Sequence, residues 1–324
     1  MRHVVLATAI LFPLAAFAAR NPSDHGPYAV GFTRRTYTKP SETTGQPRAL
    51  DTYIWYPAVA GTGSPDGAIL RDAQVARRRS PLVLFSHGSC GFQGQSPFLT
   101  ETLASWGFVV AAPPHPGNTT FELATCDADT ADSFANRVAD IRFVIDSLLA
   151  ASAPEEPLLA HRIDRRRIGV IGHSFGGQTA LRVLAADRRV RAGVGLAPAS
   201  IVGLGLRITR PAMVMTGEID SITPFRTEAR GSYDELRGRR FLVELLDAGH
   251  CAFTIACLPE FCGVGCGPGA LSLDDSHTAT LRWTVPFLQR YVAQKPAFGK
   301  LLRPGPGDSG VVVESGRRST RPAR

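Results

Sequence analysis

A serine flanked by glycines has the clearest chemical role in this chain of 324 residues. Ser174 lies in the segment Gly172-His173-Ser174-Phe175-Gly176-Gly177, which follows an unbroken apolar run and precedes a helical pattern. A serine hydroxyl that points outward from the end of a buried strand requires a sharp turn into a helix. Side chains two residues before and after the serine would clash in that turn, so both positions need glycine. The spacing predicts a nucleophile at Ser174, supported by Gly172 and Gly176, and leaves the Phe175 N–H free to bind an oxyanion.

A serine nucleophile needs a base, and the base needs an acid that orients it. After a serine on such a turn, the acid and then the histidine are expected along the chain, each beyond the end of a later strand. Asp220 and His250 meet this order, because they follow the apolar runs 212–215 and 241–246. Loops at the carboxyl ends of the strands share one edge of an open α/β sheet, where ligands bind. We therefore expect His250 to contact the Ser174 hydroxyl with one ring nitrogen and the Asp220 carboxylate with the other.

Two other carboxylates compete with Asp220 for the role of the acid. Glu218 lies in the same loop, and Asp247 lies close to His250. Asp220 is preferred because it lies deeper in its loop and is followed by a turn-forming Thr-Pro pair.

A second oxyanion donor is expected in the loop Ser86-His87-Gly88-Ser89, which follows the apolar run 82–85. A glycine-containing loop at this place can turn the Ser89 N–H toward the negative charge that develops on a tetrahedral intermediate. For His87 in the same loop, a structural role and a catalytic role both remain open.

The elements that must position these residues alternate regularly from Pro81 onward. Short unbroken apolar runs are separated by helical patterns, and runs buried on both faces are typical of a parallel sheet covered by helices. The predicted strands are 82–85, 108–112, 168–171, 192–197, 212–215 and 241–246, and the predicted helices are 97–105, 134–148, 178–186 and 280–292. We predict an α/β fold with a single doubly wound, mostly parallel sheet.

Two strands that precede this alternation, 28–37 and 50–56, are predicted to add antiparallel pairs at the N-terminal side. Residues 61–79 show no periodicity and are predicted to form an exposed loop. The segment between Ala197 and Ala212 is too short for a large helical lid. We therefore expect an open cleft that accepts short acyl chains or polymer ends.

The composition, 44% hydrophobic and 20% charged, is typical of a globular protein with a sizeable core. The formal net charge is +8, and half of it lies in residues 296–324. The basic clusters 77–79 and 165–167 have no interleaved aromatic residues, so they are typical of solvated loops and no nucleic-acid partner is expected.

Residues 1–18 are predicted to be a secretory signal peptide. Arg2 and His3 precede an apolar run, and Ala16-Phe17-Ala18 offers small residues where a signal peptidase cleaves. A retained N-terminal anchor is the alternative, although the run is short for a membrane span. No interior stretch reaches the ~18 apolar residues of a spanning helix, so no span is expected in the mature chain.

These features predict a periplasmic or secreted protein with its catalytic domain at 19–295. Residues 296–324 are rich in Pro, Gly, Ser and Arg and are predicted to be a disordered basic tail.

All six cysteines lie beyond the predicted signal peptide, and an even count in an exported chain indicates disulfides. Four of them crowd into a segment that begins directly after His250: Cys251, Cys257, Cys262 and Cys266. Their spacing fits no common zinc pattern, so two local bridges are favoured over a metal site, with the pairing left open. Cys90 and Cys126 either form a third bridge or leave Cys90 as a packed free thiol.

Five motifs in combination resemble those of the α/β-hydrolase superfamily. They are Thr52-Tyr53-Ile54-Trp55-Tyr56-Pro57-Ala58, Phe85-Ser86-His87-Gly88, Gly172-His173-Ser174-Phe175-Gly176-Gly177, Gly217-Glu218-Ile219-Asp220 and Ala248-Gly249-His250. The nearest branch resembles the bacterial predicted dienelactone hydrolases, which are related to plasma-type platelet-activating-factor acetylhydrolases and to cutinase-like polyester hydrolases. The resemblance covers about residues 28–293. It implies an esterase with nucleophile Ser174, base His250 and acid Asp220, and an oxyanion hole formed by the backbone N–H groups of Ser89 and Phe175.

Two differences from these families narrow the expected substrate and the expected position of the acid. Dienelactone hydrolases proper use a cysteine nucleophile, whereas this chain has Ser174, so their substrate is not carried over. The acetylhydrolases take their acid after the strand that follows the nucleophile helix. Here that place reads Leu196-Ala197-Pro198 without a carboxylate, which leaves Asp220, as in the cutinase-like group.

Together these observations predict a serine hydrolase that cleaves small or polymeric carboxylic esters through an acyl-enzyme, with short acyl chains favoured and without metal or cofactor. An amidase or peptidase with the same triad is one alternative, because a triad does not choose the leaving group. A hydrolase-fold protein that binds a ligand in its cleft without catalysis is the other.

Overall fold

The computed structural model describes residues 20–76, 79–122, 126, 131–151, 158–258 and 262–317. The predicted signal peptide 1–18 lies outside the described residues. Among the helices that are described, none is both long enough and apolar enough to cross a membrane.

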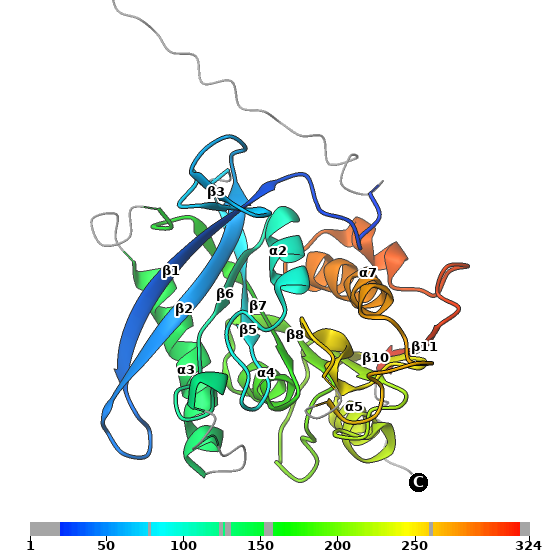
Figure 1. Ribbon diagram of the computed structural model, residues 1–324. Helices are drawn as coiled ribbons and strands as arrows, with labels where there is room; N and C mark the ends of the chain where they lie inside the picture. Colours follow the sequence, from blue (N-terminus) through cyan, green and yellow to red (C-terminus); the bar gives the residue numbers. More distant parts are fainter. Residues whose placement is uncertain are drawn as a thin grey trace, which may run out of the picture.

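Within the described residues, one mixed sheet of eleven strands runs through the molecule in the order β11-β10-β9-β8-β7-β5-β6-β2-β1-β4-β3 (Figure 1). The strands from β10 to β6 in this order are all parallel. Most of their residues are buried, as unbroken apolar runs require. Their bounds are β5 Ser80–Ser86, β6 Val109–Ala112, β7 Ile163–His173, β8 Val190–Leu196, β9 Ala212–Gly217 and β10 Arg239–Leu245. The predicted doubly wound, mostly parallel α/β sheet is confirmed.

The sheet is wound in opposite directions from β5 and from β7. β6 lies on one side of β5, whereas β7, β8, β9 and β10 extend the sheet on the other side. Where the winding reverses, the loops at the carboxyl ends of the two strands diverge and open a crevice for ligands. The loop after β5 carries Gly88 and Ser89, and β7 ends directly before Ser174.

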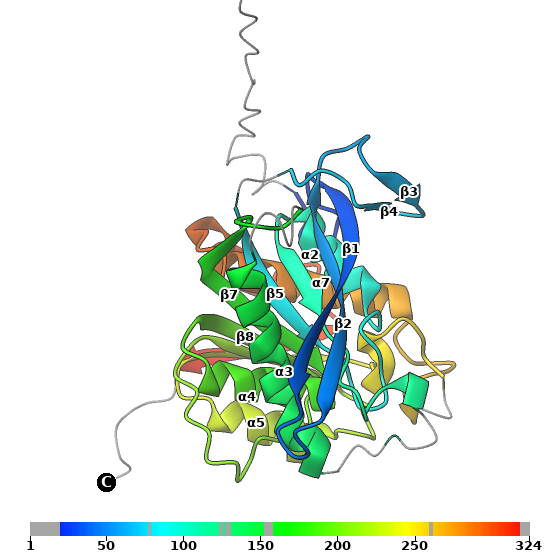
Figure 2. The ribbon, with the colours of Figure 1, turned by 90° about the vertical axis from the view of Figure 1, so that its left-hand side faces the viewer.

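The two N-terminal strands extend the sheet by antiparallel pairing, as predicted. β1 (Ala29–Pro40) pairs with β2 (Pro47–Ala58), and β2 pairs with β6. The segment predicted as an exposed loop contains a short hairpin, β3 (Ser64–Asp66) and β4 (Ile69–Arg71), which lies beside β1 at one end of the β1–β2 pair (Figure 2). Its six residues are exposed or half-buried, so they show no apolar alternation that could reveal strands in the sequence.

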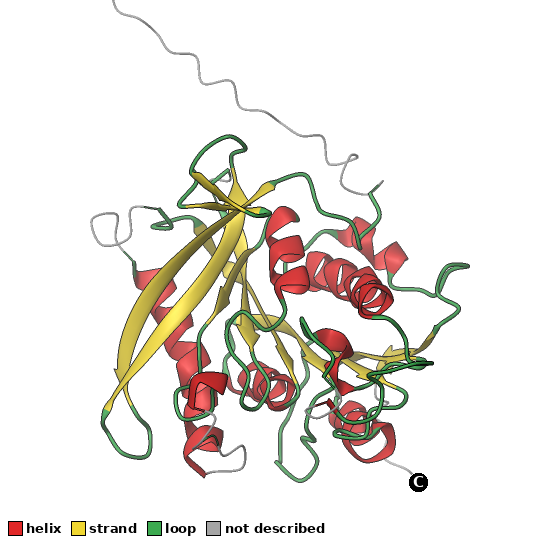
Figure 3. Cartoon of the chain, viewed as in Figure 1, coloured by secondary structure: helices red, strands yellow, loops and turns green. Residues whose placement is uncertain are grey.

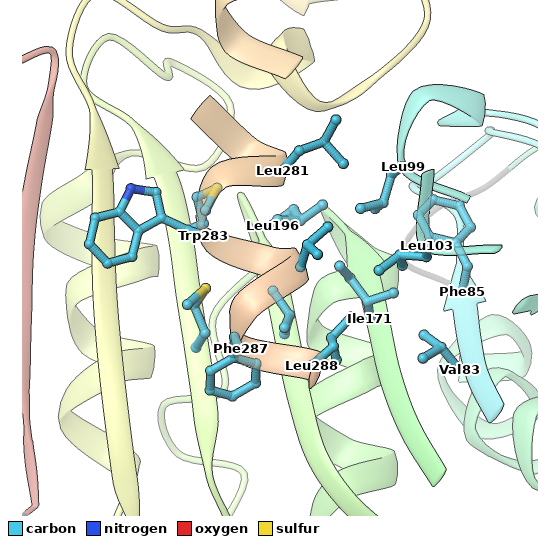
Figure 4. Packing of buried hydrophobic residues seen from close by; sticks show 14 of the residues in the cluster. Val83, Phe85, Leu99, Leu103, Ile171, Leu196, Leu281, Trp283, Phe287 and Leu288 are labelled. Carbon is cyan, nitrogen blue, oxygen red and sulfur yellow. The ribbon is translucent and has the colours of Figure 1, made fainter. Parts of the chain in front are cut away.

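Helices cover both faces of the sheet (Figure 3). On one face, α2 (Pro97–Ser105) and α7 (Leu273–Tyr291) bury apolar side chains against the strands. Leu99 of α2 and Leu288 of α7 lie in one cluster with Ile171 of β7 (Figure 4). On the other face, α3 (Ala131–Ala150) and α4 (Phe175–Ala186) form a second cluster. The other helical segments that lie wholly within the described residues are short: α5 Arg230–Glu235, η1 Thr120–Glu122, η2 Phe225–Ala229, η3 His250–Phe253 and η4 Pro296–Leu301.

The prediction of a disordered tail at 296–324 is wrong for the described part of that segment. The ring of Phe298 in η4 lies 5.8 Å from that of Trp106, and β11 (Val311–Arg317) pairs antiparallel with β10. Half-buried Val311 and Val313 alternate with exposed residues, so this strand covers the edge of β10. The Pro, Gly and Arg content of the segment indicated disorder because the apolar alternation within it is very short. Residues 318–324 lie outside the described residues.

Candidate active site

Ser174 lies on a sharp turn between β7 and α4 and has the unusual backbone angles φ 56° and ψ −125°. The glycines on either side are sterically required. A Cβ at Gly172 would lie 2.1 Å from the carbonyl oxygen of Gly176, and a Cβ at Gly176 would lie 2.0 Å from that of Ser86. The Ser174 N–H donates to the carbonyl oxygen of Leu196 at 2.8 Å, which ties the turn to the end of β8. The turn therefore has the strand-to-helix geometry that the glycine spacing predicted.

Asp220 and His250 meet beside this turn. His250, the first residue of η3, places its Nδ1 2.8 Å from Asp220 Oδ2. The Nδ1–H donates to the carboxylate, so Nε2 has the lone pair that could accept a proton. Both residues are almost fully buried.

The Asp220 carboxylate is held by its own loop. The backbone N–H groups of Ile222 and Thr223 donate to Oδ1 at 2.9 and 2.8 Å, and the Thr223 hydroxyl donates to Oδ2 at 2.7 Å. Burial raises the pKa of Asp220, but the hydrogen bonds and charge of His250 and the donors of Thr223 outweigh burial and place it below its ordinary value. The acid is therefore ionised and rigidly oriented toward the histidine.

The two competing carboxylates lie elsewhere. Glu218 Oε2 accepts a hydrogen bond from the backbone N–H of Asp247 at 3.1 Å, and both residues are exposed. Among the described residues, Asp220 alone forms a carboxylate contact with the ring of His250. The geometry thus favours Asp220, the preferred candidate from the sequence.

Ser174 and His250 line one pocket of about 540 Å³ at the crevice between the β5 and β7 loops. Its walls combine loops that are distant in the sequence: Gly88, Ser89, Cys90, Gln95, Thr120, His173, Ser174, Ile222, His250, Cys251, Thr254 and Leu258. The pocket contains a hydroxyl and an imidazole within a largely apolar wall, which suits an uncharged substrate. Between Pro198 and Pro211 the chain forms no helix or strand, so the expected absence of a large lid is confirmed for this described segment.

The two predicted oxyanion donors lie at this pocket and at the turn. Ser89 lines the pocket, and Phe175 is the first residue of α4. Within the described part of the chain, the Ser89 N–H donates to no protein acceptor. Backbone N–H groups at such positions can stabilise negative charge on a substrate oxygen.

His173 has a role that its sequence position did not reveal. Its buried ring joins two loops of the site. Nε2–H donates to the backbone carbonyl oxygen of His250 at 3.0 Å, and Nδ1 accepts from Gln95 Nε2 at 2.8 Å. Gln95 Oε1 in turn accepts from the Gly88 N–H at 2.9 Å. Burial lowers the pKa of His173 to about 3, so the ring is neutral in this chain of hydrogen bonds.

A second buried network lies behind the loop after β5. His87 donates from Nδ1 to the Gly88 carbonyl oxygen at 2.8 Å, and its Nε2 accepts from the His115 N–H at 3.0 Å. The His115 ring lies between Ser86 Oγ and Asp140 Oδ2, at 2.9 Å from each. Burial lowers the pKa of both histidines well below the ordinary value. These contacts favour the structural role that the sequence left open for His87.

The structure contains three disulfides, Cys90–Cys126, Cys251–Cys262 and Cys257–Cys266. Cys90 and Cys251 of the first two line the pocket. The disulfides confirm the expectation of two local bridges after His250 and settle their pairing. The Cys90–Cys126 bridge decides between the two alternatives left open for Cys90. The sulfur atoms of Cys257, Cys262 and Cys266 lie within 4.8 Å of one another, but all three are oxidised and offer no thiolate to a metal.

Comparison with known proteins finds a hydrolase family model and several similar hydrolases and cutinases. Residues 58–260 match a family model described as PET hydrolase-like. The chain is 25% identical over 313 residues to a bis(hydroxyethyl) terephthalate hydrolase of Streptomyces coelicolor, covering 96% of this chain and 86% of that protein. It is 28% identical over 247 residues to cutinase 2 of Thermobifida cellulosilytica, covering 74% of this chain and 79% of that protein. Cutinase est1 of Thermobifida alba is 26% identical over 242 residues, covering 74% of this chain and 70% of that protein.

Proposed function

Because this chain belongs to the PET hydrolase-like family, we propose that Ser174, His250 and Asp220 form the catalytic triad of a serine ester hydrolase. The similarity to cutinases and to a bis(hydroxyethyl) terephthalate hydrolase makes the chain a carboxylic ester hydrolase of the cutinase-like α/β-hydrolase type. The observation that supports the residue assignment is the Asp220–His250 hydrogen bond of 2.8 Å beside the pocket that Ser174 lines.

The proposed reaction proceeds through an acyl-enzyme. Ser174 Oγ attacks the ester carbonyl carbon while its proton passes to Nε2 of His250, and Asp220 stabilises the resulting imidazolium through Nδ1–H. The Ser89 and Phe175 N–H groups bind the oxygen that becomes negative. The C–O bond to the alcohol then breaks, and the alcohol leaves with the proton from His250. Water then gives a proton to His250 and attacks the acyl carbon, the bond between that carbon and Ser174 Oγ breaks, and His250 returns the proton to Ser174 Oγ as the acid leaves.

The substrate that we propose is a small ester or the end of a polyester. The pocket is compact, and its walls include Ile222, Leu258 and the Cys90 and Cys251 bridges. Such walls suit an uncharged acyl group. The described residues 198–211 form no helical lid. This leaves room for a bulky alcohol or polymer outside the pocket.

We also propose that the chain is exported after loss of residues 1–18 and acts in the periplasm or the medium without a nucleic-acid partner. Three disulfides support an oxidising destination. The catalytic domain then extends beyond residue 295, because η4 and β11 belong to the same fold.

Labelling with a fluorophosphonate probe tests the assignment. The probe should modify Ser174, and Ser174→Ala should abolish both labelling and hydrolysis of p-nitrophenyl butyrate. Ser309→Ala, at an exposed serine away from the pocket, is the matched control and should keep both. Labelling that persists in Ser174→Ala contradicts the proposal.

A substrate panel tests the class of leaving group and the acyl preference. Esters of increasing acyl length, a polyester film and the matching anilides should show fastest turnover on short-chain esters. Faster cleavage of the anilides would instead support an amidase or peptidase.

A further inference from the structure

A buried arginine lies directly beneath the loop that carries Ser89. Arg137 of α3 is fully buried, and its guanidinium donates to four oxygens. Nη1 binds the carbonyl oxygen of His87 at 2.7 Å and Ser86 Oγ at 3.5 Å, and Nη2 binds the carbonyl oxygen of Gly88 at 3.0 Å and Asn118 Oδ1. Two of the four acceptors are thus main-chain oxygens of the loop that follows β5.

The same guanidinium also touches the other segment of the proposed oxyanion hole. Its Cζ lies 4.5 Å from the centroid of the Phe175 ring, a cation–π contact. Phe175 follows Ser174 and supplies one of the two proposed oxyanion donors. One side chain therefore holds both donor segments, although they come from the ends of different strands.

The contact with Gly88 determines where the Ser89 N–H points. The Gly88 carbonyl and the Ser89 N–H belong to one trans peptide, so they point in opposite directions. The carbonyl accepts three hydrogen bonds, from Arg137 Nη2, from His87 Nδ1 at 2.8 Å and from the Gly91 N–H at 3.2 Å. With the carbonyl oxygen held inward, the Ser89 N–H is directed to the opposite side, where Ser89 lines the pocket.

A positive charge at the carbonyl end also strengthens the donor at the other end of the peptide. Hydrogen bonds accepted by a carbonyl polarise the amide and make its N–H a better donor. Among the described residues, no carboxylate lies within ion-pair distance of Arg137, and Nε has no hydrogen-bond partner. Burying such a cation is costly, so a role limited to filling space would be better served by an apolar side chain.

We propose that Arg137 is a positioning residue for the oxyanion hole, which holds the Gly88–Ser89 peptide so that the Ser89 N–H faces the substrate oxygen. This inference rests on the proposed function of the site. Arg137 should stabilise the transition state and have little effect on the binding of the uncharged ester. The reason is that the carbonyl oxygen of the ester becomes negative only during the reaction.

The test compares Arg137→Met and Arg137→Lys with the parent enzyme. Arg137→Met should lower kcat for p-nitrophenyl butyrate about 10²-fold, the usual loss for one oxyanion donor, with KM changed less than about threefold. Affinity for a boronic acid, which forms a tetrahedral adduct with serine, should fall by a similar factor. Arg137→Lys keeps the charge and one donor and should recover part of both losses.

Arg210 provides a matched control for the loss of an arginine that binds carbonyl oxygens. Its guanidinium donates to the carbonyl oxygens of Leu184, Asp187 and Val190 near the end of α4, away from the pocket. Arg210→Met should lower the melting temperature and leave kcat unchanged.

A kcat within threefold of the parent in Arg137→Met would overturn the proposal, whatever the melting temperature. If Arg137→Met does not fold, Arg137→Lys decides: unchanged kcat and boronate affinity overturn the proposal, and a coupled loss of about tenfold supports it. A failure of the proposed function gives a different result: Ser174→Ala would then remain active, whichever residue stands at position 137.

Discussion

The Nε2–H of His173 donates to the backbone carbonyl oxygen of His250 at 3.0 Å. His173 directly precedes Ser174, so this bond ties the turn that carries the hydroxyl to the loop that carries the imidazole. The two rings also pack against each other, with centroids 4.6 Å apart. The relative position of Ser174 and His250 thus depends on a third residue that takes no part in the proposed proton transfer.

His173 should make the stability of the fold dependent on pH. Burial lowers its pKa to about 3 in the folded chain, whereas the unfolded chain has an ordinary histidine near 6.5. Between these values the unfolded state binds more protons, so the free energy of unfolding falls as pH falls. The contribution of this residue is about 1.4 kcal/mol per pH unit.

Denaturant unfolding of the parent and of His173→Gln between pH 4 and 6 measures this effect. The variant should have a lower free energy of unfolding at pH 6. The slope of that free energy against pH should be smaller than in the parent by the amount that corresponds to about one bound proton. His161→Gln, at an exposed histidine, is the control and should keep the slope of the parent. Equal slopes for parent and His173→Gln would show that the ring is not held neutral.

The central sheet and the three proposed triad positions could be predicted because each has a local pattern. Unbroken apolar runs indicate buried parallel strands. Gly172 and Gly176 mark the turn by their spacing around Ser174, although a Cβ at Gly176 would meet the main chain of Ser86 and not that of the turn itself. Asp220 and His250 follow from strand order, because loops at the carboxyl ends of parallel strands share one edge.

The supporting residues had no such pattern. Arg137 meets His87 and Gly88 from about fifty positions away, and Gln95 meets His173 from 78 positions away. Contacts of this kind depend on how elements cross in space, which residue spacing does not encode. β11 was missed for a related reason, since its pairing with β10 outweighs a local composition that indicates disorder.

Asp220→Asn should keep the fold and lose most of the activity. An amide cannot stabilise the imidazolium of His250 and can favour the wrong ring tautomer, so kcat should fall about 10³- to 10⁴-fold. Glu218→Gln and Asp247→Asn remove the two other carboxylates considered for this role. Both should leave kcat for p-nitrophenyl butyrate within twofold, and a large loss in either one would move the acid away from Asp220.

Gly176→Ala should disrupt both the turn and the loop after β5. The added Cβ would lie 2.0 Å from the carbonyl oxygen of Ser86 and 2.4 Å from that of His87. Because both obstacles are main chain, the turn and the loop must separate. We expect a loss of stability of at least about 2 kcal/mol with activity below detection. Gly267→Ala, where a Cβ meets no atom within 4 Å, should match the parent in thermal unfolding and turnover.

The bridge between Cys251 and Cys262 should affect catalysis as well as stability. Cys251 directly follows His250 and lines the pocket, whereas Cys257–Cys266 closes a loop farther along the chain. The two bridges span 11 and 9 residues, so each should contribute a similar stabilisation of about 3 kcal/mol by limiting the unfolded chain. The double variants Cys251→Ser/Cys262→Ser and Cys257→Ser/Cys266→Ser should therefore lower the melting temperature by similar amounts. Only the first should also lower kcat, because it frees the backbone beside the imidazole. Equal kcat values in the two variants, measured well below both melting temperatures, would mean that the bridge stabilises the loop without positioning His250.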